Sequence, residues 1–427
     1  MIFLPVCHND ITNIEIMSFS PAPNQETAKN EHAATFMHDL MIVVPLFMVL
    51  FLVFMDHLVM VPLGADIAKG TQLNPLHIGY LIAIYPLTAS LAAFLAAPFS
   101  DRWGRKKMLL ILSFGFIAAS IGCALSDSPV TIFLFRILSA LFGGPIMPNV
   151  TSFVGDLFTG ERRTRAITTV MLAFSVSSIL GVPFGAWIGQ TYSWNITFYI
   201  IAFISAVCLL FILRMEPIAT GAEKGSIAQQ YRELLGLWKG KKIRRLFSAQ
   251  FFMIVGLFGL VPNLSVWLTT NYGMNATEVG LCYMQGGIGG VIGNQLSNRF
   301  LKISSREGVV SLGSFIMGVV ILIFSMGRFT SPYAGIFFAG LMFGGSLRMP
   351  SYMLILTEVI SINLRGRLMS MSMIISNFSM GIGGFWSTPL LTLSDGKLHG
   401  MPIIGWIAFS TALLVTPIIY SYKSLQD

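Results

Sequence analysis

Very few ionisable side chains lie deep inside the long apolar runs of this sequence. They are Asp56, His57, Arg136 and Arg348, and Asp56 is the only carboxylate among them. A charge in the middle of a membrane is costly, so it usually marks a transport pathway or an ion pair. These four residues are therefore the first candidates for chemistry.

Asp56 and Arg136 are expected at similar depth. Asp56 lies six residues before Pro62, where the first apolar run ends, and Arg136 lies six residues after Val130, where the fourth begins. A helix rises 1.5 Å per residue, which places both roughly 9 Å below the same end of the molecule.

Two interpretations of an Asp56–Arg136 pair remain open. It is either a structural ion pair, or a proton switch in which Arg136 moves away and Asp56, being buried, takes up a proton. His57 points about 100° away from Asp56 on a helix. His57 is either a second proton-binding group, or a histidine that lies at the lipid interface or packs against other helices.

Arg348 lies beyond the middle of its apolar run. A guanidinium binds a carboxylate bidentately, so Arg348 is either a substrate anchor or a packing arginine. With Arg136 and Arg348 against Asp56, the sequence predicts a positive cavity and an anionic or polar solute. Uncharged polar residues inside the runs are further cavity candidates, although such residues more often form a hydrogen bond between helices than a ligand contact: Tyr85, Asn149, Asn263, Gln285 and Asn377.

The sequence shows no sign of an enzyme. No set of His, Cys and Asp residues has the spacing of a metal site, and no Ser/His/Asp set falls in a soluble segment. No phosphate-binding motif is present. We therefore expect no cofactor or metal. We expect the energy to come from an ion gradient, with protons as the expected ion, or from the solute gradient itself.

Membrane spans are the elements that must position these residues. The chain is 54% hydrophobic and 11% charged, whereas a soluble domain is about 25% charged. A span needs about 20 mostly apolar residues. Twelve runs qualify: Met41–Pro62, Ile78–Pro98, Met108–Leu125, Val130–Phe153, Ala166–Ile188, Ile196–Leu213, Phe247–Thr269, Val279–Leu296, Val309–Met326, Tyr333–Thr357, Leu368–Leu391 and Ile403–Tyr420.

The positive charges predict the orientation. Of the 27 Lys and Arg residues, 22 lie in the tails and in the loops that follow even-numbered runs, and only Lys69, Arg328 and Lys397 lie in the other loops. Basic residues are retained on the cytoplasmic side, so both termini are expected there. The same rule explains the net charge of +8, so binding to nucleic acid is not needed to account for it.

The charged stretches also suggest the domain boundaries. We expect a cytoplasmic tail over residues 1–37, with Met1 or Met17 as the start, and no signal peptide. Two six-helix bundles are expected over 38–214 and 246–422. A cytoplasmic linker over 215–245 and a short tail over 423–427 complete the chain.

An internal repeat relates the two halves. The segment Leu141–Gly144 matches Met342–Gly345, and further along Asp156 matches Glu358 and Gly181 matches Gly383. Two related halves in a membrane predict a cavity between them and alternating access by rocking.

The segment from Ala97 to Lys107, APFSDRWGRKK, follows the second run. It resembles the motif G-x-L-x-D-R-x-G-R-K of the major facilitator superfamily, with Ala97 in place of the first glycine. The resemblance implies an all-α fold of twelve transmembrane helices in two pseudo-symmetric bundles, acting as a monomer. It also implies a cytoplasmic gate made of Asp101, Arg102, Gly104, Arg105 and Lys106 together with Arg365 and Arg367.

Other segments resemble the bacterial drug and sugar efflux permeases of that superfamily. They are Phe54–Gly64 and Gly181–Gly185, in which Gly181, Pro183 and Gly185 are expected to bend and pack the fifth span. The fourth-span motif R-x-x-Q-G keeps Arg136 but has Ser139 and Ala140. The resemblance implies a secondary transporter of the bacterial inner membrane that moves a small solute out by proton antiport. Proton-coupled uptake of an anionic metabolite or carboxylate siderophore, or a receptor without flux, are the alternatives.

Overall fold

The computed structural model describes the chain except for residues 1–24, 216–226, 360–364 and 424–427. Residues 1–42 and residues 43–427 form two separate units. In the first unit, residues 25–42 are helical and belong to the long helix α1 (Gln25–Gly70). The second unit is the helical bundle that contains every candidate site residue.

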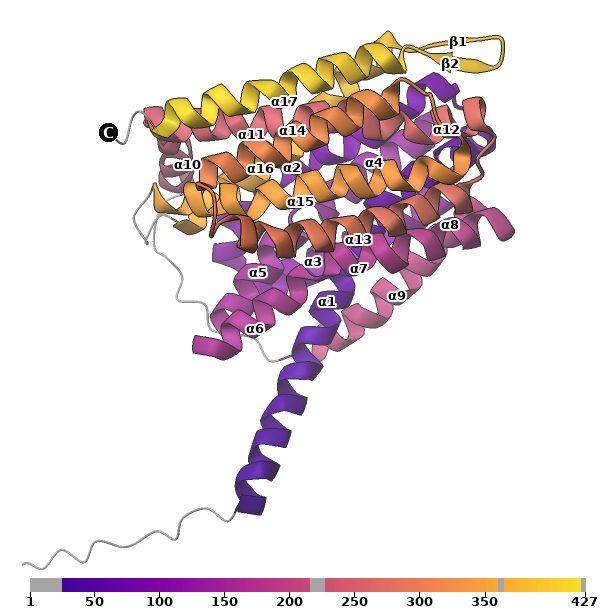
Figure 1. The fold of residues 1–427 in the computed structure, drawn as a ribbon. Coiled ribbons are helices and arrows are strands. Elements are labelled where there is room, and N and C mark those ends of the chain that lie inside the picture. The colour runs from indigo at the N-terminus through magenta and orange to yellow at the C-terminus, as the bar shows by residue number, and fades with distance from the viewer. Residues whose placement is uncertain (1–24, 216–226, 360–364, 424–427) are drawn as a thin grey trace, which may run out of the picture. The chain divides into compact units, whose positions relative to one another are not determined.

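The first half of the bundle contains the rest of α1 and eight further helical segments (Figure 1). They are α2 (Ile78–Trp103), α3 (Arg105–Ala124), α4 (Pro129–Gly143), α5 (Ile146–Leu157), α6 (Gly160–Met171), α7 (Ala173–Val176), α8 (Val182–Thr191) and α9 (Trp194–Arg214). A short 3-10 turn, η1 (Pro75–His77), precedes α2, and a π-helical segment, η2 (Ser177–Gly181), joins α7 to α8.

The second half follows a short helix, α10 (Ile227–Gly236), and the turn η3 (Leu237–Lys239). It contains α11 (Lys241–Leu260), η4 (Val261–Asn263), α12 (Leu264–Tyr272), α13 (Ala276–Phe300), α14 (Arg306–Ser325), η5 (Ser331–Tyr333), α15 (Ala334–Glu358), α16 (Arg365–Ser387), η7 (Thr388–Leu390) and α17 (Met401–Lys423). Between η7 and α17 the strands β1 (Thr392–Ser394) and β2 (Lys397–His399) form an antiparallel hairpin.

Within the described residues, ten segments are long and apolar enough to cross a membrane. The other two predicted spans correspond to α13 and α15, which are helices of 25 residues each. Both are packed in the bundle, and neither is among the ten segments that meet the criterion of length and apolar composition. The count of twelve spans therefore remains a prediction for these two helices.

The prediction that the first span ends at Pro62 is wrong. Helix α1 continues for eight residues to Gly70, with Pro62 inside it. Leu63 and Ile67 are completely buried in this extension. Packing of these side chains therefore holds the helix together across the proline, which lacks one backbone donor.

Several of the other predicted spans are interrupted helices, and the seventh is divided into α11, η4 and α12. The fourth is divided into α4 and α5 near Gly144, where a Cβ atom would lie 2.6 Å from the Cα of Ala89 on α2. The fifth consists of α6, α7, η2 and α8, and Pro183 lies in the first turn of α8. Gly185 faces Met55 of α1, and a Cβ atom added at Gly185 would lie 2.7 Å from the Met55 side chain. Small residues at these points allow close approach of helices.

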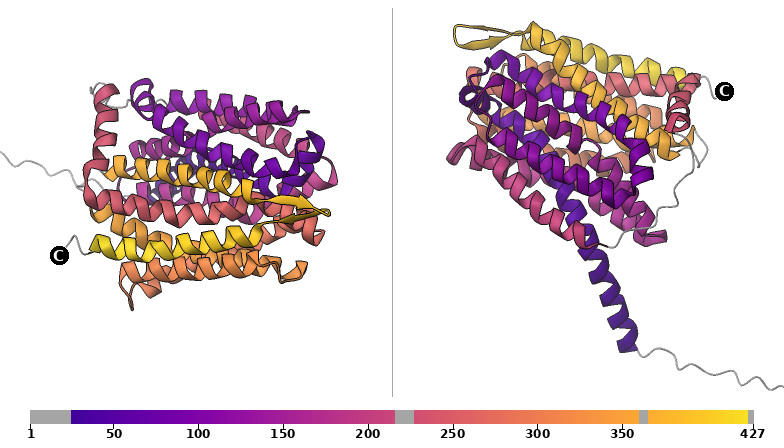
Figure 2. Two further views of the ribbon diagram at one scale, coloured as in Figure 1. Left: turned by 90° about the horizontal axis from the view of Figure 1, so that it is seen from above. Right: turned by 180° about the vertical axis from the view of Figure 1, so that it is seen from behind.

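The two halves pack side by side along two seams (Figure 2). In one seam α2 lies against α16, and in the other α8 and η2 lie against α13. The hydroxyl of Ser90 on α2 donates to the carbonyl of Ile374 on α16 at 2.9 Å. Gly381 and Gly384 of α16 face Leu87 and Ala83 of α2, so the backbones approach closely.

Candidate functional site

The centre of the candidate site is an ion pair between α1 and α4. The Nη1 of Arg136 donates to the Oδ2 of Asp56 at 2.7 Å, and both side chains have 0% exposure. The hydroxyl of Ser139, one turn further along α4, donates to the same oxygen at 3.0 Å. The predicted meeting of Asp56 and Arg136 is therefore present in the structure.

Two aromatic rings extend this pair toward α2. The guanidinium of Arg136 lies 4.5 Å from the centre of the Tyr85 ring. His57 stacks on the same ring, with centroids 4.8 Å apart and planes inclined by 27°. A cation above an aromatic face is attracted by the ring quadrupole. The two proton-coupling candidates His57 and Arg136 are thus joined through Tyr85.

Several buried polar atoms of this cluster lack a hydrogen-bond partner within the described part of the chain. They are Asp56 Oδ1, His57 Nδ1, the Tyr85 hydroxyl and Arg136 Nε and Nη2. Buried polar atoms are almost always hydrogen-bonded, so a group of orphans requires an explanation. Such unpaired atoms are expected in a cluster whose residues exchange hydrogen-bond partners in another conformation, or that binds a polar solute.

The local sequence explains how α4 presents Arg136. Ser128 and Thr131 form a capping box at the start of this helix, and Pro129 occupies its first turn. These features fix where the helix begins, so Arg136 and Ser139 point to the same side one turn apart.

Asp56 is deeper in α1 than the sequence suggested. It lies 14 residues before Gly70, where the helix ends, which corresponds to about 21 Å of helix. The prediction of roughly 9 Å is wrong, because it assumed that the helix ends at Pro62. Because the extra residues project beyond the start of α4, Asp56 and Arg136 still meet.

Arg348 does not join this cluster. Its side chain, with 2% exposure, donates to the carbonyl of Met253 on α11 and, at 3.2 Å, to the hydroxyl of Ser314 on α14. No carboxylate within the described residues pairs with it. The expectation of a shared positive cavity built from Arg136 and Arg348 is therefore not met in this conformation, because Arg348 points toward α14 within its own half.

Two of the uncharged candidates are bonded between elements. Asn149 on α5 accepts from Ser100 at 2.7 Å and donates to the carbonyl of Arg105 at 3.0 Å. Asn263 donates to the hydroxyl of Ser387 at 3.0 Å. These contacts match the helix–helix interpretation of both asparagines.

The remaining two candidates, Gln285 and Asn377, lie on α13 and α16. Gln285 is exposed on α13 and its amide packs against Gly335 of α15. Asn377 is half-buried on α16. Asn377 therefore remains a candidate for solute contact.

Sequence reasoning missed a buried polar network around Gln250 on α11. Its amide nitrogen donates to Ser372 Oγ at 2.8 Å and to Ser376 Oγ at 2.6 Å, both on α16. Its oxygen accepts from Tyr352 on α15 at 3.2 Å and from Ser372. The sequence does indicate part of this network, because Ser372 and Ser376 are four residues apart and so lie on the same face of a helix.

The predicted gate residues lie around the junction of α2 and α3. Gly104 has a φ of +85°, which separates the two helices. Arg105 pairs with Asp156 at the end of α5, and Lys106 donates to the carbonyl of Leu213 at 2.9 Å. Arg102 is exposed and Arg367 half-buried. The side chains of Asp101 and Arg365 lie outside the described residues.

The second half contains an ion pair that corresponds to the pair between Arg105 and Asp156. Arg306 at the start of α14 pairs with Glu358 at the end of α15. Glu358 is the residue that the internal repeat matches with Asp156. The repeat is therefore present in three dimensions as well as in sequence.

The two halves also meet at the end of the bundle that carries the β hairpin. The Oγ of Ser265 on α12 donates to the carbonyl of Pro62 at 3.4 Å and accepts from the backbone of Ala65 at 3.3 Å. Nearby, a Cβ on Gly79 would lie 2.1 Å from Thr388 Oγ1 and 2.4 Å from Asn263 Oδ1. These contacts close the hairpin end, which the Lys and Arg distribution predicts to be periplasmic.

A comparison with protein families agrees with this architecture. The model of the Major Facilitator Superfamily matches residues 46–384, which is most of the chain. The chain belongs to the Major Facilitator Superfamily. It is a multi-pass membrane transporter of small molecules rather than an enzyme, and the family and the all-α membrane fold predicted from the motif around Asp101 are confirmed.

Related sequences agree with the assignment, and a solved structure shows the same fold. The uncharacterised MFS-type transporter YwfA of Bacillus subtilis is 27% identical over 86% of this chain and 89% of its own. Multidrug resistance protein 1 of B. subtilis is 24% identical over 57% of this chain and 62% of its own. A gallate transporter of Pseudomonas putida is 33% identical over 25% of this chain and 24% of its own. The crystal structure of the nucleoside transporter NupG superposes with a TM-score of 0.72 at 14% identity, covering 89% of this chain and 99% of that one, which shows the common fold.

Proposed function

We propose that this transporter couples the export of a small organic solute to the entry of protons through the Asp56–Arg136 pair. The observation that carries the proposal is a carboxylate and a guanidinium at 2.7 Å with no exposure to solvent. Such a pair is poorly justified as a source of stability, since desolvation offsets much of the attraction. A role in the transport cycle gives a reason to keep it.

The exchange of partners at Asp56 supplies the coupling. Burial penalises an isolated carboxylate, and in this structure Arg136 neutralises the carboxylate of Asp56. When a change of conformation separates the two, the carboxylate takes up a proton. A cationic or polar solute that bonds to Asp56 would exclude the proton, and this competition is the basis of antiport.

Export is favoured by the names of related proteins. Multidrug resistance protein 1 of B. subtilis and a bicyclomycin resistance protein homologue of Haemophilus influenzae both match this chain. Neither match exceeds 24% identity, so it supports a class of transport and not a shared substrate.

Proton-coupled uptake of an anionic solute is the second candidate. The donors Arg136 Nε and Nη2 lack acceptors within the described part of the chain, and a carboxylate could occupy them. A solute that bonded to Arg136 would release Asp56 to bind a proton, so solute and proton would move together. The match to the gallate transporter is consistent with this direction.

Proton movement in liposomes distinguishes these mechanisms. The purified protein is reconstituted with a pH dye inside, and cationic, neutral and anionic solutes are added outside. Alkalinisation of the interior on solute addition is the expected antiport signal, whereas acidification would establish uptake with protons.

Asp56→Asn should abolish either proton signal. Asp66→Asn serves as the control, because Asp66 is on the same helix but outside the pair. If Asp56→Asn kept normal proton movement, the proposed coupling would be wrong. If radiolabelled solute entered with no pH change in the unmodified protein, Asp56 and Arg136 would be a structural ion pair.

A further inference from the structure

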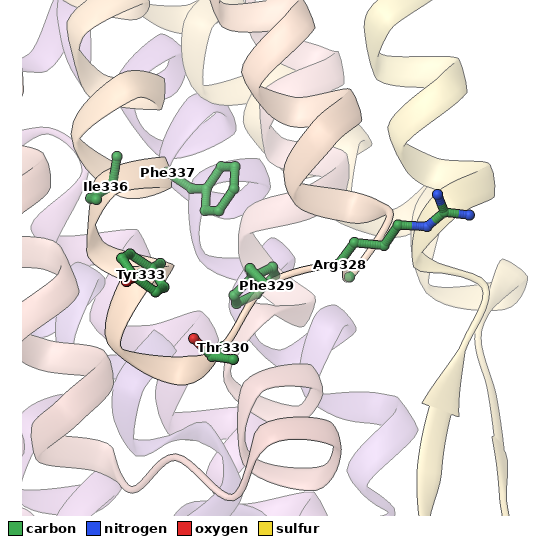
Figure 3. Close-up of a pocket in the computed structure, with 7 residues that line it drawn as sticks. Arg328, Phe329, Thr330, Tyr333, Ile336 and Phe337 are labelled. Carbon is green, nitrogen blue, oxygen red and sulfur yellow. The ribbon is translucent and has the colours of Figure 1, made fainter.

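A pocket of about 670 Å³ lies on the connection between α14 and α15. Residues 327–330 line one side and Tyr333, Ile336 and Phe337 of η5 and α15 line the other. Figure 3 shows the rings of Phe329, Tyr333 and Phe337 around it. The pocket is outside the Asp56–Arg136 site, and the proposed transport mechanism does not use it.

The floor of the pocket is held by ring contacts and a hydrogen bond. The Phe329 ring stacks on Tyr272 of α12, with centroids 4.4 Å apart, and lies 5.2 Å from Phe337. The hydroxyl of Tyr272 donates to the carbonyl of Gly327 at 2.8 Å, and Gly327 has a φ of +68°. These contacts fix the loop that forms one wall, so the pocket is preformed.

The rim of the pocket faces outward from the bundle, at the level where α14 ends and α15 begins. Tyr333 and Ile336 are 59% and 63% exposed, and Ile323 on α14 is 53% exposed. At the end of a span such side chains meet lipid, and tyrosine is typical of the interface between acyl chains and headgroups. The surroundings of the pocket are therefore those of a lipid.

Arg328 gives the rim a positive charge. It is exposed, and no acidic side chain in the described ranges lies within ion-pair distance of it. Figure 3 shows its guanidinium extending away from the rings toward α17. Basic residues are scarce at this end of the spans, which makes a retained arginine informative.

We propose that the pocket binds one anionic phospholipid. The glycerol and upper acyl chain would lie against Phe329, Ile336 and Phe337, while Arg328 would bond to the phosphate at the rim. A guanidinium is well suited to phosphate oxygens because it presents several donors in one plane. The proposal is independent of the transported solute and of proton coupling.

Lipid binding to the full-length protein tests the proposal. The protein is purified in detergent, and its affinities for phosphatidylglycerol and phosphatidylcholine of identical acyl chains are measured by native mass spectrometry and by the shift in melting temperature. We expect a preference for phosphatidylglycerol. Arg328→Gln should weaken phosphatidylglycerol binding about five-fold, which corresponds to about 1 kcal/mol for one basic residue near a headgroup. Arg328→Lys should retain most of the preference.

Two controls separate the pocket from general surface charge. Lys397→Gln removes a basic residue from the β hairpin at the same end and should leave the preference unchanged. Ile336→Ser should weaken both lipids alike, because it alters only the apolar wall. Equal binding of the two lipids, an unaltered preference in Arg328→Gln, or an equal loss in Lys397→Gln would each overturn the proposal. So would displacement of the lipid by millimolar glycerol phosphate, which would indicate a site for a soluble anion.

Discussion

The carboxylate of Asp56 and the guanidinium of Arg136 illustrate what can be predicted at the scale of single residues. A charge in an apolar run needs a partner, and these two were the only opposite charges at matching depth. The direction of Arg348 could not be predicted in the same way. The direction of its side chain depends on how α15 is rotated about its axis when it packs against α11 and α14. That rotation cannot be derived from a single sequence.

Removing one member of the buried pair should be costly. Breaking a buried ion pair from one side typically destabilises by about 3–5 kcal/mol, because the remaining charge loses its compensation. We expect Arg136→Gln to lower the melting temperature markedly, and the double variant Asp56→Asn/Arg136→Gln to recover part of the loss. Thermal unfolding of the purified protein measures this. A double variant as unstable as the single one would show that Arg136 acts chiefly by packing on Tyr85.

Gln250 should matter for stability although it carries no charge. Gln250→Leu leaves the buried hydroxyls of Tyr352 and Ser372 without one of their partners, and an unsatisfied buried group costs about 1–3 kcal/mol. We expect a lower melting temperature than in the exposed control Gln295→Leu on α13. Equal melting temperatures would mean that the hydroxyls find other acceptors.

At the scale of elements, the apolar runs predicted the helices better than the points where they end or break. Pro62 was expected to end α1, but buried side chains beyond it outweigh the missing donor. The β hairpin was not predicted, although Asp395-Gly396 between two short polar segments is a strong hairpin signal. Both residues have positive φ, as that turn requires.

The side chain of Asn271 bonds the hairpin to α12. Asn271 donates to the carbonyl of Leu398 at 3.0 Å and accepts from its amide at 2.8 Å. Asn271→Ala removes both bonds, so the Leu398 amide should exchange with deuterium much faster, by about 5- to 150-fold for a local cost of 1–3 kcal/mol. Hydrogen exchange with mass spectrometry measures this for the hairpin peptide. In the control Asn195→Ala, whose amide bonds to Ala124 on α3, hairpin exchange should be unchanged.

At the scale of the whole molecule, the internal repeat predicted two related halves. The matched pairs Arg105–Asp156 and Arg306–Glu358 fit that expectation. The conformational state could not be predicted, because alternating access requires one sequence to support several packings of the same two halves. Which end is closed depends on contacts such as Ser265 with Pro62, between residues about 200 positions apart.

Closure of the hairpin end should depend on the absence of a side chain at Gly79. A Cβ there would lie within 2.4 Å of both Thr388 and Asn263, so Gly79→Val forces α2 away from η4 and η7. Overpacking typically costs about 1–3 kcal/mol, which shifts a two-state equilibrium roughly 5- to 150-fold toward the state open at this end. The labelling rate of Ser265→Cys by a soluble maleimide, measured in nanodiscs, should rise accordingly. Gly345→Val on α15 is the matched control, because nothing lies within 4 Å of its Cβ position. If both valine variants label at the same rate, the Gly79 contact does not govern closure, and the seam between α2 and α16 must hold the halves together elsewhere.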